Sequence, residues 1–151
     1  MKNNMFEANI ILCEQMEKGT PKGIFNNIEI KKGDGASFDV GIFFTADIIT
    51  CGKEMFLVNI VYQDEMTDKA PTNILGSIEK TYKEAGLSRE LIVLKDNAVD
   101  FPWEGIYALE LRHCKECVDI NAERSIEETI KVITDSTIVN TFTFSVEFKK
   151  E

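Results

Sequence analysis

The chain has 151 residues, of which 44% are apolar and 28% are charged. This length and apolar share are typical of one globular domain spanning residues 1–151, and they exclude a disordered chain. The 26 acidic residues outnumber the 17 basic ones and give a net charge of −9. Binding to nucleic acid or to an anionic membrane is therefore not expected, because both need clustered Lys and Arg.

Neither a leader peptide nor a membrane span is predicted. The longest early apolar stretch, residues 8–12, is interrupted by Asn9, and no other stretch approaches the roughly 18 apolar residues that cross a bilayer. We therefore expect a cytoplasmic protein. Its four cysteines are too few for a disulfide scaffold in a chain of this length, so we expect reduced thiols.

The first half of the chain is rich in predicted strands. Two apolar runs, residues 8–15 and 23–30, come first. From Phe38 to Ile48, and again from 55 to 63, every second residue is apolar, which is the period of a strand with one buried face. The turn residues between these two strands predict that they pair as a hairpin.

Residues 74–85 are predicted to form a helix. Four of their side chains recur at helical spacing, the preceding Thr72 and Asn73 offer a cap, and Gly86 stands where helices commonly end. Opposite charges also recur four residues apart, as in Glu79 and Lys83, which supports an exposed helix. A strand is the alternative, and Gly76 weakens both interpretations.

The second half returns to strands. Residues 91–94, 106–112 and 126–133 are predicted strands, although Glu128 breaks the alternation of the third, and 141–148 alternates most strictly. Short strands separated by turn residues are typical of a sandwich or barrel. We predict a mainly β fold: an antiparallel two-layer β-sandwich with one short inserted helix at about residues 74–85.

Three pieces of the chain resemble an uncharacterised bacterial family of small domains. They are an apolar run at 8–14, Gly-Ile-Phe-Asn-Asn-Ile at 23–28, and Phe-Pro-Trp-Glu-Gly-Ile-Tyr at 101–107. That family enters a late strand through an F-P-x-x-G-x-Y motif. The resemblance implies an antiparallel β-sandwich, somewhat like the lipid-binding sandwiches of calcium-dependent membrane modules. It implies no activity, and residues 63–91 depart from the family pattern.

The segment 101–107 predicts a sharp entry into a strand. Pro102 favours an extended residue before it, and Gly105 permits a backbone angle that other residues avoid. Trp103 would then lie at one end of the sandwich. A structural corner is the favoured interpretation, and a partner-binding aromatic is the alternative.

The segment 113–117, His-Cys-Lys-Glu-Cys, is the group with most potential for metal chemistry. Cys114 and Cys117 have the spacing at which two thiolates share one zinc, and His113 could add a nitrogen ligand. Adjacent residues of a strand point to opposite faces, however, and the remaining thiols, Cys13 and Cys51, stand alone. The three residues are weak metal candidates. We favour two small apolar side chains closing a hairpin, and expect no cofactor.

Catalytic motifs are not evident either. His113 is the sole histidine, so any Ser-His or Cys-His pair must use it, and its sequence neighbour Cys114 cannot face it along a strand. The chain has neither the Gly-x-Ser-x-Gly motif of hydrolases nor the phosphate-binding loop of nucleotide hydrolases. We therefore do not predict an enzyme.

The leading hypothesis is a non-enzymatic protein-binding or assembly module that engages a protein partner, or a second copy, through loops or a sheet edge. An alternative rests on residues 96–147, whose eleven acidic and four basic residues give a net charge of −7. It is an acidic decoy that mimics nucleic-acid charge in conflict between bacteria and viruses. The candidate partner-binding residues are Trp103, Glu123, Glu127 and Glu128. A third hypothesis, a zinc-assisted hydrolase or small-ligand enzyme, rests on His113, Cys114 and Cys117.

Overall fold

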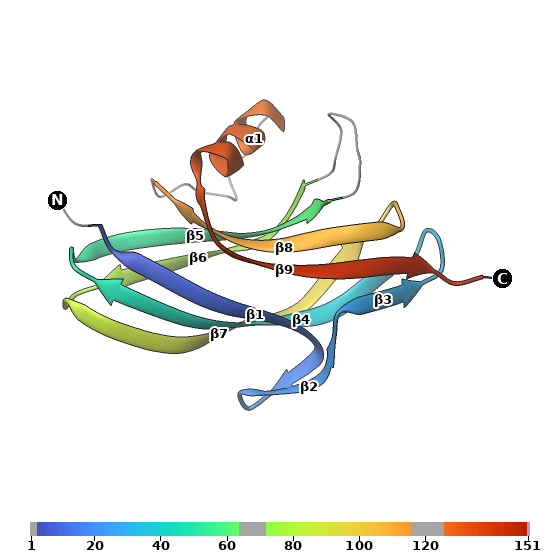
Figure 1. Cartoon of the computed structure of the whole chain (residues 1–151), viewed down its shortest axis with the longest axis horizontal. Coiled ribbons are helices and arrows are strands. Elements are labelled where there is room, and N and C mark those ends of the chain that lie inside the picture. Colours follow the sequence, from blue (N-terminus) through green and yellow to red (C-terminus); the bar gives the residue numbers. More distant parts are fainter. Residues whose placement is uncertain (1–2, 64–71, 116–125, 151) are drawn as a thin grey trace.

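Two β-sheets pack face to face in the computed structural model, which describes residues 3–63, 72–115 and 126–150 (Figure 1). Sheet A has the strand order β2-β1-β4-β7, and sheet B has the order β3-β9-β8-β5-β6. The elements are β1 (Met5–Glu17), β2 (Thr20–Phe25), β3 (Asn27–Ile30), β4 (Gly35–Ile48), β5 (Gly52–Tyr62), β6 (Thr72–Tyr82), β7 (Gly86–Asp100), β8 (Gly105–Cys114), α1 (Ile126–Asp135) and β9 (Thr137–Phe148). The predicted mainly β, two-layer fold is confirmed.

The core lies between the sheets and is built from the alternating apolar residues. On β4 the inward residues are Phe38, Val40, Ile42 and Phe44, all at most 2% exposed. Phe56 of β5 meets Phe44 edge to face, with 5.0 Å between the ring centroids. Each such buried side chain stabilises the fold by about 1.5–3 kcal/mol. The period-two pattern therefore identified the buried faces of these strands.

The predicted hairpin of residues 38–48 and 55–63 is wrong. β4 pairs with β1 and β7 in sheet A, whereas β5 pairs with β6 and β8 in sheet B. The turn between β4 and β5 therefore crosses from one layer to the other. Two strands with equally apolar inner faces can pack across a core as well as pair side by side, and alternation along each strand does not distinguish these arrangements.

The predicted strand 23–30 is divided between the two sheets. β2 pairs with β1 in sheet A, and after Asn26 the chain enters sheet B as β3, which runs parallel to β9. The sandwich is thus not wholly antiparallel. The change of layer also explains the exposure pattern, since Ile24 is 61% exposed while Ile28 and Ile30 are buried.

The predicted helix 74–85 is also wrong, because most of it belongs to β6. Its register with β5 places Ile78 opposite Phe56, so pairing with a buried strand outweighs helical spacing. The charges expected to pair along a helix pair between strands instead: Lys80 with Glu90 at 2.7 Å, and Lys53 with Glu79 at 3.2 Å. Gly76 lies at a register shift of β5 and β6, which accounts for a glycine inside a strand.

The predicted strand 126–133 is instead helix α1. Glu127 and Glu128 lie in its first turn, where acidic side chains interact favourably with the helix dipole. Val132 packs against Met55, Leu57 and Cys114 on the outer side of sheet B. The interruption of the alternation at Glu128 was therefore the helical signal.

A buried carboxylate joins three strands of sheet A. Asp39, 3% exposed, accepts hydrogen bonds from the backbone N–H of Met16 on β1 and of Asp96 on β7, both at 2.8 Å. It sits at the register shift between β4 and β7. This carboxylate ties the β1–β2 hairpin and the far end of β7 to the centre of the sheet.

Candidate functional site

Two of the metal candidates, His113 and Cys114, lie on opposite faces of β8, as strand geometry predicts. His113 packs between the sheets, with its ring centroid 4.8 Å from that of Phe6 and 5.2 Å from that of Phe56. Cys114 is buried on the other face, in contact with Met55 and Leu57. The structure therefore does not bring His113 and Cys114 together.

The other predicted site residues are dispersed. Cys13 is buried and Cys51 is exposed, while Cys117 and Glu123 lie outside the described residues. Within residues 3–63, 72–115 and 126–150, no three His, Cys, Asp or Glu side chains form a group that could hold a metal ion. Glu127 and Glu128 are exposed on α1.

Trp103 occupies a corner at one end of the sandwich. Its side chain is 37% exposed and packs on Tyr62 at 5.4 Å between centroids. Its carbonyl oxygen accepts a hydrogen bond from the Tyr107 hydroxyl at 2.8 Å, in the manner of the tyrosine corners of β-sandwiches. Gly105 has φ 134°, which supplies the turn expected before β8.

His113 has a partner that the sequence did not suggest. Its Nε2 is hydrogen-bonded to Glu54 Oε2, and the other oxygen of Glu54 accepts a hydrogen bond from Asn4 Nδ2 at 3.2 Å. Asn4 also accepts hydrogen bonds from the backbone N–H groups of Ile49 and Thr50. The N-terminal residues are thereby attached to the β4–β5 turn and to the His113–Glu54 pair.

A pocket of about 600 Å³ opens beside this pair. We call it the His113 pocket. It is lined by Asn3, Asn4, Phe6, Thr50, Glu54, His113, Lys115, Thr137, Ile138 and Val139. These residues come from the start of β1, the β4–β5 turn, the end of β8 and the start of β9, which are distant in sequence. No local motif could have identified the pocket.

Tyr82 lies close to the same carboxylate on the β6 side. Its hydroxyl is buried and has no hydrogen-bond partner among the described residues. Burial, together with the nearby charges of Glu90 and Glu54, raises the pKa of Tyr82 to about 12. This end of the inter-sheet space is therefore polar, unlike the apolar centre.

A second buried polar group lies under α1. Arg112 forms a bidentate ion pair with Glu110, at 2.9 and 3.1 Å, and donates a hydrogen bond to the carbonyl oxygen of Ile133 at 3.0 Å. Asn59, fully buried, donates to Glu110 at 3.3 Å. These contacts attach the helix to sheet B, and we assign them a structural role.

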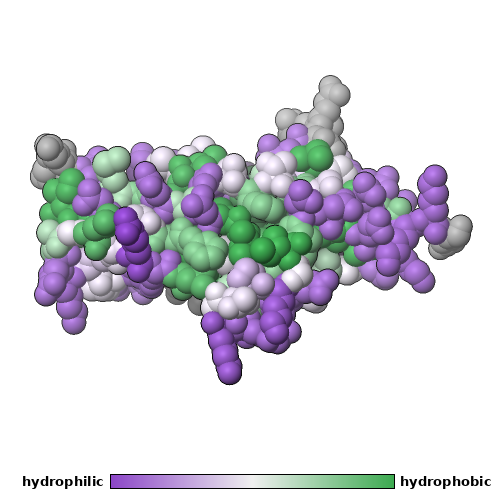
Figure 2. Space-filling view, turned by 60° about the horizontal axis from the view of Figure 1, so that its bottom comes forward, coloured by the Kyte–Doolittle hydropathy of each residue, from purple (hydrophilic) through white to green (hydrophobic). Residues whose placement is uncertain are grey.

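The outer face of sheet A carries several exposed apolar side chains. The registers of β1, β4 and β7 place Asn9, Phe43 and Leu91 in one row and Met5, Asp47 and Leu87 in another. Exposed fractions reach 63% for Met5, 62% for Leu87 and 44% for Phe43. Figure 2, from the side of sheet A, shows green apolar patches in the middle of the molecule, with purple hydrophilic side chains between them. Exposed apolar side chains grouped on one face of a protein can mark an interaction site.

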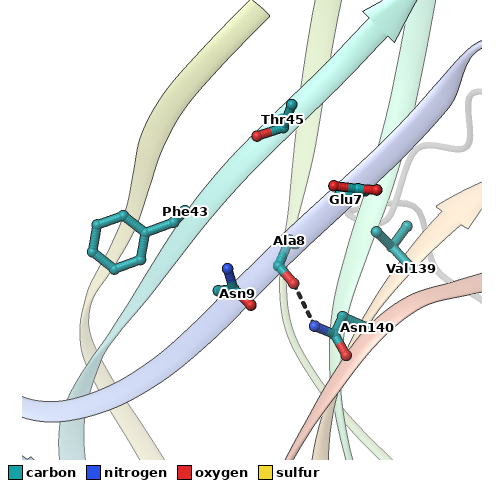
Figure 3. Close-up of a pocket in the computed structure, with 7 residues that line it drawn as sticks. All are labelled: Glu7, Ala8, Asn9, Phe43, Thr45, Val139 and Asn140. Carbon is teal, nitrogen blue, oxygen red and sulfur yellow. Dashed lines mark hydrogen bonds between the residues drawn. The ribbon is translucent and has the colours of Figure 1, made fainter.

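A smaller hollow of about 350 Å³ borders this face (Figure 3). Glu7, Asn9, Phe43 and Thr45 line it from sheet A, and Val139 and Asn140 line it from β9, which belongs to the other sheet. The Asn140 side chain donates a hydrogen bond to the backbone oxygen of Ala8 across the hollow. The sheets are thus linked on the β1 side.

On the opposite side, sheet A ends in a long strand. β7 pairs with β4 along one edge, and no strand within the described part of the chain pairs with its other edge. Its pairing with β4 is regular from Gly86 to Leu94 and becomes irregular beyond. Residues 86–94 thus form a regularly paired strand with a free edge beside the outer face of sheet A. The apolar run 91–94 predicted a strand, but not that it would lie at an edge.

Comparisons with known proteins do not assign this chain to a family. Among the described residues, no helix has the length and apolar character needed to cross a membrane. The resemblance to a bacterial family of small sandwiches stays an expectation from sequence. No protein-family model and no curated protein sequence matches the chain.

Proposed function

We propose that this chain is a non-enzymatic protein-binding module that binds an extended segment of a partner protein along the free edge of β7. The observation that carries the proposal is the regular edge of residues 86–94 beside exposed apolar side chains. An unpaired strand edge presents backbone N–H and C=O groups to another chain, and an added strand satisfies them.

The side chains of β7 define what the added strand should carry. Leu87, Arg89, Leu91 and Val93 share the outer face, as their pairing with successive outward residues of β4 requires. Leu87 is exposed, and Leu91 and Val93 are half-buried. Apolar residues at alternate positions of a partner segment would cover them, since cross-strand pairs on one face contact each other.

Arg89 supplies a charge within this apolar row. Its side chain is exposed and makes no ion pair within the described residues. An opposite charge on the neighbouring strand stabilises a sheet by about 0.2–1 kcal/mol. The preferred partner segment is therefore extended, with an acidic residue flanked at alternate positions by β-branched apolar residues.

A peptide titration tests this proposal. A short peptide with Val, Glu and Val at alternate positions is added to the isotopically labelled protein, and backbone amide signals are followed by NMR. We expect saturable shifts confined to β7 and its neighbours. Binding should weaken about fivefold in Arg89→Glu and be regained with a peptide that carries Lys in place of Glu.

The matched control is Lys31→Glu, which makes the same charge change at an exposed turn residue and should leave affinity unaltered. A peptide with proline at the central positions should not bind, because proline lacks the backbone donor. Shifts that avoid β7, or equal affinity of both peptides for Arg89→Glu, would contradict the proposal.

A further inference from the structure

We infer that the His113 pocket is a binding site for a small organic anion with an apolar body, such as an aromatic carboxylate or phosphate. The pocket is on the β1 and β9 side of the sandwich, whereas β7 is at the other edge of sheet A. The inference is thus independent of the proposed protein-binding edge. The volume of about 600 Å³ lies within the range of small-molecule sites, about 300–1,000 Å³.

The acidic group of the pocket is already occupied. Both oxygens of Glu54 are engaged, one by Asn4 and the other by His113. A cationic ligand would have to displace one of these contacts. The Glu54 carboxylate therefore positions the imidazole and does not act as the receptor for a positive charge.

The basic group of the pocket is available. Lys115 lines the wall, is exposed, and has no ion pair within the described residues. Thr137 also lines the pocket, and it is paired with His113 in the sheet. An ammonium and a hydroxyl next to an imidazole are suitable donors for a carboxylate or phosphate.

Three of the remaining lining residues are apolar. Phe6, Ile138 and Val139 line the pocket, and Ile138 is 46% exposed. A ligand that buries an apolar ring against these side chains gains binding free energy from the hydrophobic effect, while its anionic end faces Lys115. Phe6 and Phe56 pack on the His113 ring, so the wall is held in place before a ligand binds.

The sole histidine provides a specific reporter of this pocket. The imidazole C–H signals of His113 are followed by NMR during titration with benzoate and phenyl phosphate, and with benzyl alcohol and benzylamine as neutral and cationic counterparts. We expect saturable shifts with at least one anion, and none with the cation. Lys115→Gln should weaken anion binding about tenfold.

The matched control is Lys95→Gln, which removes an exposed lysine of β7 and should leave affinity unaltered. The amide spectrum of each variant verifies that it is folded. Absence of saturable shifts with both anions, binding of benzyl alcohol as tight as that of the tighter anion, saturable shifts with benzylamine, or unaltered affinity in Lys115→Gln would each overturn the inference.

Discussion

Replacing Asp39 by alanine removes the carboxylate that holds three strands of sheet A together. Asp39 is 3% exposed, and its two oxygens each accept one backbone N–H, from Met16 and from Asp96. Asp96 has φ 54°, a left-handed conformation that a hydrogen-bonded anchor helps to maintain. The substitution therefore leaves two N–H groups without their acceptor at a bend of the sheet.

The magnitude follows from these two contacts. A hydrogen bond to a charged group contributes about 1.5–3 kcal/mol, so the gross loss is about 3–6 kcal/mol. Removing a buried charge recovers part of it, because the carboxylate no longer has to be desolvated. We expect the free energy of unfolding to fall by about 3 kcal/mol. Asp39→Asn should cost nearly as much, since its NH₂ group would face one of the two N–H donors.

Urea denaturation, followed by circular dichroism and by the fluorescence of the single tryptophan, measures the change. The control is Asp47→Ala on the same strand, where the carboxylate is exposed and removal should cost less than about 0.5 kcal/mol. If Asp39→Ala and Asp47→Ala unfold at the same urea concentration with equal slopes, the assigned role of Asp39 is refuted.

In Arg112→Met the Glu110 carboxylate stays buried without its cation. The free energy of unfolding should therefore fall by about 3–5 kcal/mol. Adding Glu110→Leu to that variant should restore most of the loss, and urea titrations measure both changes. Burial raises the Tyr82 pKa from 10.0 to about 12. Stability should therefore fall as pH rises from about 10 to 12, and this contribution should be absent in Tyr82→Phe; that variant should also lose a component of the phenolate absorbance that titrates near pH 12. Exposed Cys51 should react with a thiol reagent in the folded protein. The pKa of Cys13 is raised chiefly by burial, so that thiol should react only after unfolding. Peptide mass spectrometry would show which cysteine has reacted.

The sequence by itself determined which side of many strands is buried. In β4, β5 and β9 the period-two alternation identified inward residues such as Phe44, Phe56 and Phe144, all at most 2% exposed. The same rule separated His113 from Cys114, and Pro102 with Gly105 predicted the sharp entry into β8. These conclusions succeed because the direction of a side chain along a strand is a local property of the backbone.

Only the tertiary structure decided which strands are neighbours and what meets between them. The pairing of β6 with β5 overrode a helical pattern, and the turn after β4 joined two layers instead of two paired strands. The His113 pocket and the free edge of β7 follow from those pairings. Register between distant strands depends on the packing of the whole chain, because each segment has several partners of similar apolar character.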